Sequence, residues 1–202
     1  MTVTADQVLA AAERWELSQT LSRTESAAEK LAAYGNLLLH WNARLSLTAI
    51  RDKAQVIERH LMEGIFAAKH HPSGATALDF GSGTGIPGIP IAICRPGLSV
   101  VLAESQRKKA AFLQEVVRRL GLPASVHAGR AETLPIGSFD AVWMRAVDKG
   151  TTMLPAAAAL VAKAGSLCLF GTGIAPSLPS WRWKTLPFPG STGRVLHIAQ
   201  RA

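Results

Sequence analysis

The stretch Asp79-Phe-Gly-Ser-Gly-Thr-Gly85 decides the fold of this chain. It overlaps the end of a short apolar run, Thr76–Phe80, that predicts a β-strand, and a helical pattern begins at about Pro87. Glycines at positions 81, 83, 85 and 88 permit a tight turn and let a ligand approach the backbone closely. The helix that follows presents free backbone N–H groups in its first turn. A strand, a glycine loop and a helix in this order predict a ligand site at the carboxyl end of a strand.

Outward from this loop, short apolar runs alternate with helical segments. Further strands are predicted at Ser99–Glu104, Ser125–Ala128, Phe139–Met144 and Ser166–Phe170, and helices at Gln106–Leu120 and Thr151–Lys163. This alternation predicts an α/β fold with a mostly parallel sheet covered on both faces. Trp181–Leu186 and Arg194–Gln200 flank a Pro- and Gly-rich turn, so we expect them to form an antiparallel hairpin at the edge of the sheet.

The part of the chain before this core is predicted to be helical. Thr4-x-x-Gln7 matches a capping box at the start of a short helix. A longer helix is indicated by apolar residues at three- and four-residue steps, which are Leu31, Tyr34, Leu38, Trp41 and Leu45. A third helix is predicted from about Lys53 to Lys69. We therefore expect a helical extension, residues 1–72, that packs on a core domain, residues 73–202, as one structural unit.

Composition restricts the class of protein. Hydrophobic residues make up 48% of the 202 residues and charged residues 18%, which indicates a globular chain rather than a disordered one. A net charge of +8 favours an anionic partner, either nucleic acid or a membrane surface, over a basic surface without one. No apolar run approaches the ~20 residues of a membrane span. Cys94 and Cys168 lie in apolar surroundings, so we expect buried, reduced thiols in a cytoplasmic protein and no metal site.

Two ligand classes compete for the glycine loop. Gly83-x-Gly85-x-x-Gly88 matches the dinucleotide fingerprint, whereas Asp79-x-Gly81-x-Gly83-x-Gly85 matches the loop that binds S-adenosylmethionine. The acidic Asp79 would repel a pyrophosphate and attract a ligand with a cationic amino group. Pro87 and Pro90 lie in the first turn of the helix, where proline is tolerated because the N–H groups are unpaired. The glycine pattern alone leaves both cofactors open, and Asp79 favours S-adenosylmethionine.

Acidic residues follow the next two predicted strands. Glu104 ends Ser99–Glu104, where a carboxylate can accept both ribose hydroxyls of a nucleoside, which suits NAD equally well. A solvated strand-end glutamate is the alternative. After the third strand, the small Ala131 would let an adenine lie against the backbone. Glu132 would accept from the adenine amino group or cap a turn.

At this point the sequence resembles a known family. The motifs that carry the resemblance occur in order: Leu39-His-Trp-Asn42, Ser46-Leu-Thr-Ala-Ile-Arg-Asp52, Glu58-Arg-His-Leu61, Gly81-Ser-Gly-Thr-Gly-Ile-Pro-Gly-Ile-Pro90, Lys108-Lys-Ala-Ala-Phe-Leu113, Gly129-Arg-Ala-Glu132 and Met144-Arg-Ala-Val147. Together they resemble the glucose-inhibited division protein B family over roughly residues 30 to 171. Members of that family are bacterial 16S ribosomal RNA guanine-N(7) methyltransferases that modify the 530 loop of the small subunit.

The resemblance implies a Rossmann-like class I methyltransferase that uses S-adenosylmethionine and releases S-adenosylhomocysteine. The implied partner is 16S ribosomal RNA or the small ribosomal subunit, and we expect a cytoplasmic monomer that does not bind membranes. The residues expected to bind the cofactor are Asp79, Gly81, Ser82, Gly83, Gly85, Pro87, Glu104, Ser105, Ala131, Glu132 and Arg145.

Arg145, at the end of the strand Phe139–Met144, is the residue expected nearest the chemistry. It would bind the cofactor carboxylate or donate to guanine oxygen 6. The alternative is an ion pair with Asp140 or Asp148. No general base is required, because guanine nitrogen 7 already carries a free lone pair.

The surface expected to meet RNA is basic. Its candidate residues are Arg51, Arg59, His60, Lys108 and Lys109. For each of these lysines and arginines, a solvated surface charge is an equal alternative, and His60 either packs beneath the helices or reaches the pocket. Trp41 is expected in the core because of its helical spacing.

The chain departs from the family pattern at three places. Ser46 stands where asparagine is usual, Glu63-Gly64 replaces Asp-Ser, and Phe170-Gly171 replaces a Lys-Gly. These departures leave a non-catalytic RNA-binding relative as one alternative. An NAD-binding oxidoreductase on a similar sheet is the other, and tight binding of S-adenosylhomocysteine with none of NADH would separate the methyltransferase from it.

Overall fold

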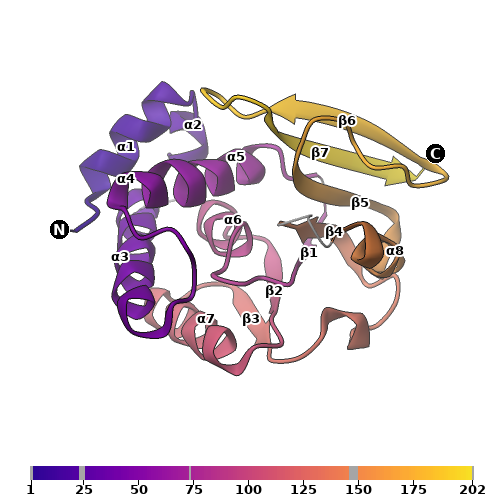
Figure 1. Cartoon of the computed structure of the whole chain (residues 1–202), viewed down its shortest axis with the longest axis horizontal. Helices are drawn as coiled ribbons and strands as arrows, with labels where there is room; N and C mark the ends of the chain where they lie inside the picture. Colours follow the sequence, from indigo (N-terminus) through magenta and orange to yellow (C-terminus); the bar gives the residue numbers. More distant parts are fainter. Residues whose placement is uncertain (1, 23–25, 73, 146–149, 202) are drawn as a thin grey trace.

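A seven-stranded sheet forms the centre of the molecule (Figure 1). The computed structural model describes residues 2–22, 26–72, 74–145 and 150–201. The strands are β1 (Thr76–Phe80), β2 (Ser99–Ala103), β3 (Ala124–His127), β4 (Phe139–Met144), β5 (Val161–Thr172), β6 (Trp181–Pro187) and β7 (Arg194–Arg201). Their order is β3-β2-β1-β4-β5-β7-β6. The first five strands pair in parallel and the β6–β7 hairpin pairs antiparallel to β5 at the edge, which confirms the predicted sheet.

Helices precede the sheet and connect its strands. They are α1 (Ala5–Arg14), α2 (Ser18–Leu21), α3 (Ala27–Leu45), α4 (Lys53–Gln55), the π-helix η1 (Val56–Met62), α5 (Glu63–Lys69), α6 (Gly88–Cys94), α7 (Arg107–Leu120), the 3₁₀ turn η2 (Ala131–Thr133) and α8 (Gly150–Leu160). The predicted capping box at Thr4 and Gln7 is present. In the described ranges, no helix combines the length and the apolar character needed to cross a membrane.

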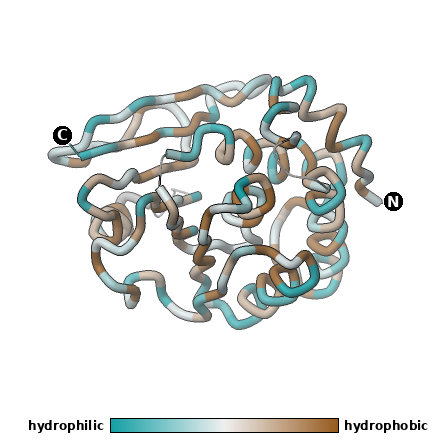
Figure 2. Tube along the Cα trace, turned by 180° about the vertical axis from the view of Figure 1, so that it is seen from behind, coloured by the Kyte–Doolittle hydropathy of each residue, from teal (hydrophilic) through white to brown (hydrophobic). Residues whose placement is uncertain are grey.

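Alternating side chains of the central strands divide the core into two layers. Ala141 and Trp143 of β4 belong to the layer that includes the N-terminal helices, α6 and α7, whereas Val142 and Met144 face the layer that includes α8. Figure 1 shows the N-terminal helices gathered on one side of the sheet and α8 on the other. Figure 2 shows hydrophilic and hydrophobic stretches that alternate along the tube of α7, as expected for a helix with one buried side.

The strand order places a ligand site at one end of the sheet. β1 lies between β2 and β4, so the order of the strands reverses at β1 and β4. In open α/β sheets, ligands bind outside the carboxyl ends of the strands at such a point. Phe80 and Met144, which end β1 and β4, are paired in register, so the glycine loop after β1 and Arg145 after β4 are neighbours.

The predicted helix from Lys53 to Lys69 is present, but its middle turns are wound as the π-helix η1. The π-helical turn is rare and is frequently found at functional sites. α3 contacts α6 and α7, and α5 contacts α6, so the N-terminal helices pack directly on the core. The division of the chain into residues 1–72 and 73–202 remains a prediction.

The largest error in the predicted bounds lies between α8 and β5, while other bounds differ by one or two residues. The helix expected to reach Lys163 ends at Leu160, and β5 begins at Val161 rather than Ser166. Val161 pairs with Phe139, and the register then shifts before Ala141. Gly165 permits this irregularity, because a Cβ there would come within 2.8 Å of the Asp140 carbonyl oxygen. The Ala- and Gly-rich segment shows no alternation that would have marked it as a strand.

Candidate functional site

The glycine loop is open toward solvent on one side and tightly packed on the other. Gly81, Gly83 and Gly85 all have positive φ, which favours glycine. A Cβ on Gly81 would meet nothing within 4 Å, and one on Gly83 would meet only the Gly81 carbonyl oxygen at 3.9 Å. A Cβ on Gly88, by contrast, would lie 2.3 Å from Leu102 and 2.7 Å from Asp79 Oδ2. The first glycines therefore leave room for a ligand, and the last one allows α6 to pack on β1 and β2.

Asp79 lies beneath this loop and is 1% exposed. Its Oδ2 accepts a hydrogen bond from the backbone N–H of Gly88 at 3.0 Å. Its Oδ1 is buried and has no hydrogen-bond partner in the described structure. Burial raises the pKa of Asp79 to about 7, although the Gly88 N–H bond opposes this shift. An unpaired buried acceptor beside an open loop is what a cationic donor on a ligand would satisfy.

Glu104 joins the glycine loop to the start of α7. Its Oε2 accepts from the backbone N–H of Gly83 at 2.8 Å, and its Oε1 accepts from the N–H of Gln106 at 2.7 Å. The side chain is 6% exposed, so it is not a solvated strand-end glutamate. Each carboxylate oxygen has a second lone-pair direction, and the predicted contact with a ribose stays a prediction.

Tyr34 of α3 also supports the loop, and sequence reasoning missed this role. Its hydroxyl donates to the Thr84 carbonyl oxygen at 2.7 Å, and the ring is fully buried. Burial raises the pKa of Tyr34 well above its usual range, so the hydroxyl remains a donor. Tyr34 was expected only as part of an apolar helical stripe, and nothing in that pattern marks a partner so far along the chain.

Arg145 lies at the carboxyl end of β4 in a cluster of charged residues. Its Nη2 contacts Glu63 Oε2 at 2.9 Å and donates to the carbonyl oxygen of Arg59 at 2.8 Å. Arg194 of β7 forms an ion pair with the other oxygen of Glu63. The alternative pairing of Arg145 with Asp140 is wrong, because Asp140 Oδ2 instead accepts from Ala75 and Thr76. Asp148 lies outside the described residues.

Burial shapes the electrostatics of this cluster. It lowers the pKa of Arg145 to about 10, so the guanidinium stays charged near neutral pH. Burial also lowers the pKa of His60 to about 3, with smaller contributions from the Arg145 and Arg59 charges. His60 is therefore neutral near pH 7, and neither ring nitrogen has a partner in the described structure. It is 5% exposed, so its expected contact with RNA would have to occur inside the pocket.

The remaining predicted cofactor residues lie around the same strand ends. Ser82 Oγ donates to the Asp79 carbonyl oxygen at 2.9 Å, and Pro87 is the N-cap of α6. Ala131 is buried in η2, whereas Glu132 and Ser105 are exposed. Glu132 does not cap η2, which has no side-chain cap. The structure brings these positions to one edge of the sheet but leaves their contacts with a cofactor as predictions.

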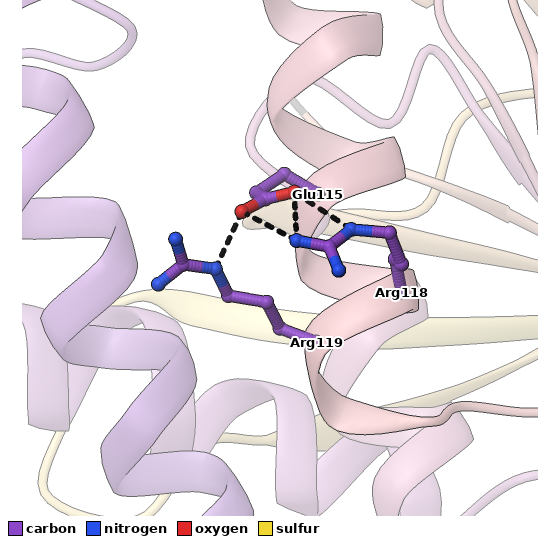
Figure 3. A network of polar contacts seen from close by, with 3 residues as sticks. All are labelled: Glu115, Arg118 and Arg119. Atoms are coloured by element: carbon purple, nitrogen blue, oxygen red, sulfur yellow. Dashed lines mark hydrogen bonds and ion pairs between the residues drawn. The ribbon is translucent and has the colours of Figure 1, made fainter.

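Most of the predicted RNA contacts are at the surface. Arg51, Arg59 and Lys108 are exposed, and Lys109 is half-buried. Further along α7, Glu115 binds both Arg118 and Arg119 (Figure 3). A groove of about 510 Å³ separates this end of α7 from α3, and the indole of Trp41, half-buried, lines it. The core position predicted for Trp41 is thus confirmed only in part. One side of its ring contacts Phe112 edge-on, with 5.6 Å between the ring centroids, and Trp41 also lines the groove.

Comparison with solved structures identifies the fold. A SAM dependent methyltransferase from Aquifex aeolicus covers 78% of this chain and 97% of its own, with a TM-score of 0.60 and 14% identity. A methyltransferase from Geobacter sulfurreducens covers 81% of this chain and 86% of its own, with a TM-score of 0.59 and 16% identity. The fold is therefore that of the class I methyltransferases, as predicted.

Sequence comparison then gives the family. The chain belongs to the GidB family, described as rRNA small subunit methyltransferase G, whose model matches residues 27–172. A ribosomal RNA small subunit methyltransferase G from Xanthomonas axonopodis pv. citri is 40% identical over 165 residues, which is 81% of this chain and 76% of that relative. A ribosomal RNA small subunit methyltransferase G from Neisseria meningitidis is 42% identical over 127 residues, which is 62% of this chain. The matched region spans 61% of the length of that Neisseria relative.

Proposed function

We propose that this protein transfers a methyl group from S-adenosylmethionine to nitrogen 7 of a guanine in the 530 loop of 16S ribosomal RNA. The observation that carries the proposal is Oδ1 of Asp79, which has no hydrogen-bond partner among the described residues and is buried beside a glycine loop that is open on one side. Membership of the GidB family supports the reaction and the substrate. The same membership argues against an NAD-binding oxidoreductase.

The residues at the strand ends fit S-adenosylmethionine. Asp79 Oδ1 would accept from the cofactor ammonium group, directly or through a water, and Glu104 would accept from the ribose hydroxyls. Ala131 and Glu132 would lie along the adenine. When bound, the cofactor supplies a methyl group on a positively charged sulfur, which a nitrogen lone pair can attack. The chain's own task is to position the two reactants and to exclude water.

Arg145 is the residue proposed to contact the reactants. Its Nη1 is buried and has no hydrogen-bond partner among the described residues, whereas Nη2 is held by Glu63 and by the carbonyl of Arg59. The free Nη1 would donate to guanine oxygen 6 or to the cofactor carboxylate. The neutral His60 would not protonate guanine nitrogen 7, so the lone pair of the nucleophile stays available.

Lys108 and Lys109 open α7 directly after Glu104, next to the proposed cofactor site. We propose that they contact RNA phosphates, together with Arg51 and Arg59. Such contacts would orient the RNA without reading its sequence. We further propose that the protein acts as a monomer in the cytoplasm, and sedimentation of the purified chain with and without RNA tests the first part.

The test is methyl transfer with defined RNA. Purified protein is incubated with labelled S-adenosylmethionine and either free 16S RNA or small subunits from cells that lack the gene. Label should appear at one guanine of the 530 loop, mapped by cleavage at N(7)-methylguanine. Asp79→Asn should lose most activity, whereas Asp6→Asn, in the first turn of α1, is the matched control. No label on either substrate would support the non-catalytic relative, and binding of NADH instead of S-adenosylhomocysteine would support the oxidoreductase.

A further inference from the structure

Glu63 is a buried carboxylate shared by two arginines from distant parts of the chain. Its side chain is 3% exposed, while those of Arg145 and Arg194 are 19% and 30% exposed. Glu63 begins α5, Arg145 follows β4 and Arg194 begins β7. One glutamate therefore links the N-terminal helices, the centre of the sheet and its edge hairpin at the proposed active site.

Arg145 is held by three different groups. Glu63 Oε2 lies 2.9 Å from Nη2, the Arg59 carbonyl oxygen accepts from the same nitrogen at 2.8 Å, and the Phe170 ring lies 5.3 Å from the guanidinium carbon. A cation over an aromatic face is attracted by the ring. These contacts fix the plane of the guanidinium, and among the described residues the buried Nη1 has no hydrogen-bond partner.

Arg59 lies within the π-helix η1, and its carbonyl accepts from Arg145 Nη2. In an α-helix that carbonyl would accept from the N–H of Glu63, four residues later. Here the Glu63 N–H donates to the His60 carbonyl instead. The end of η1 thus brings both the carbonyl of Arg59 and the carboxylate of Glu63 to Arg145.

From this geometry we propose that Glu63 is a positioning residue for methyl transfer. It aligns Arg145 so that Nη1 faces the reactants, and it holds Arg194 beside Arg145 as a second cation. The inference rests on the proposed role of Arg145. Without the carboxylate, the two guanidinium groups would lose the counter-charge that both of them contact, so each would be driven toward solvent or another partner.

The main test is Glu63→Gln, which keeps the shape of the side chain and removes its charge. We expect kcat to fall about 100-fold, as for a small displacement of a reacting group. The dissociation constant of S-adenosylhomocysteine shows which reactant Nη1 contacts: it should change less than about twofold if Nη1 donates to guanine oxygen 6, and it should rise if Nη1 donates to the cofactor carboxylate. Glu63→Asp keeps the charge and should restore most of the lost kcat. Glu58→Gln is the matched control, since Glu58 lies on the same π-helix and pairs with Arg14 instead.

A double variant separates positioning from folding. Glu63→Gln with Arg194→Gln removes one charge of each sign, so it should fold even where the single variant does not. If Glu63 positions Arg145, the double variant still has a low kcat. A double variant with full kcat would overturn the inference, as would a Glu63→Asp protein as slow as Glu63→Gln.

Arg145→Gln distinguishes failure of this inference from failure of the proposed function. If Arg145→Gln is inactive while a folded Glu63→Gln protein keeps its kcat, Arg145 acts without help from Glu63 and only the inference is wrong. If Arg145→Gln is fully active, the proposed role of Arg145 is wrong, and the inference is wrong with it.

Discussion

Ser46 adopts a backbone conformation that few residues favour. It is the C-cap of α3, with φ 49° and ψ 52°, in the left-handed region. Asparagine and glycine adopt this conformation at lower cost than serine. Ser46→Asn should therefore raise the free energy of unfolding by about 0.5 kcal/mol, a fraction of the 1–2 kcal/mol left-handed penalty.

Urea unfolding measures this change. Ser22→Asn is the control, because Ser22 caps α2 with right-handed angles, φ −66° and ψ −11°, and should gain nothing. Equal gains at both positions would contradict the explanation from the left-handed region. The departure from the family pattern at Ser46 then concerns stability rather than the site.

Asp79 should make cofactor binding depend on pH. A carboxylate attracts the cofactor ammonium group, but the pKa of Asp79 is raised to about 7, so the group is partly protonated at neutral pH. Affinity for S-adenosylhomocysteine should rise as the pH increases from 6 to 8, the range around that pKa. Calorimetry on Asp79→Asn should show weaker binding without this rise. A parent protein whose affinity is flat across that range would contradict the prediction.

The same group should affect stability with a definite sign. The pKa of Asp79 is higher in the folded protein than its ordinary value of 3.8, so the folded state binds more protons between these values. The stability that Asp79 contributes is fully present below pH 3.8 and is lost as the pH rises through about 7. His60 and His71, with lowered pKa values, act in the opposite direction. Comparing parent with Asp79→Asn cancels their contributions, and the difference in unfolding free energy isolates Asp79.

At the residue scale, the sequence predicted the side chains that lie in the glycine loop or at the end of the neighbouring strand. Asp79, Glu104 and Ser82 are all next to it, because strand ends in this fold meet at one edge. Tyr34, Glu63 and Arg194 were missed as site residues. Each acts through a partner far along the chain, and local periodicity carries no information about such contacts.

The link between α3 and the glycine loop is a property of two elements. Tyr34→Phe removes the donor to the Thr84 carbonyl and leaves that buried acceptor unpaired. The free energy of unfolding should fall by about 1–2 kcal/mol. Because the loop would lose its support, affinity for S-adenosylhomocysteine should fall too.

Asn36→Ala provides the matched control for this link. Asn36 lies on the same helix and exchanges hydrogen bonds with the backbone of Val3, at 2.7 and 2.8 Å. Asn36→Ala should lower the free energy of unfolding by a similar amount without weakening cofactor binding. If both variants bind S-adenosylhomocysteine as the parent does, the tyrosine does not support the loop in solution.

Most elements could be predicted because their patterns are local. β1 and β4 have the predicted bounds, and Gly121 ends α7 in the left-handed conformation expected of a C-cap glycine. The start of β5 and the π-helical winding of η1 could not be predicted. The start of β5 depends on pairing with β4, and the winding of η1 depends on packing against neighbours. Neither can be recognised from the spacing of hydrophobic residues.

At the scale of the whole molecule, the net charge of +8 should appear in the salt dependence of RNA binding. Each phosphate contact contributes roughly 0.7 to the slope of log affinity against log salt for single-stranded RNA. Lys108→Gln and Lys109→Gln should each lower this slope by about that amount. Filter binding at several salt concentrations measures it.

Lys30→Gln is the control for charge alone. Lys30 lies near Leu122 and Pro123, which precede β3. It is therefore near the amino ends of the parallel strands, whereas the proposed site is at their carboxyl ends. The Lys30→Gln variant should leave the slope of log affinity against log salt unchanged. A slope that falls equally in all three variants would indicate a general effect of net charge rather than contacts at α7.

The family and the fold class were both predicted correctly from the sequence, and they rest on different information. The fold follows from alternating strands and helices, whereas the family follows from several short motifs in a fixed order. Neither determines how distant charged groups pair. Glu63 stands where the family usually has Asp. Its contacts with Arg145 and Arg194 are visible only in the structure, because these residues lie far apart in the sequence.

The position of Arg194 also sets an order of events during synthesis. A ribosome makes Glu63, the glycine loop and Arg145 before it makes β7, and β7 then pairs with β5 on one side and with β6 on the other. Until it does, a nascent chain has a cofactor loop but only half of the arginine pair, and the edge of β5 is open to other strands. The proposed active site is thus finished late, by a segment that contributes nothing to the glycine loop itself.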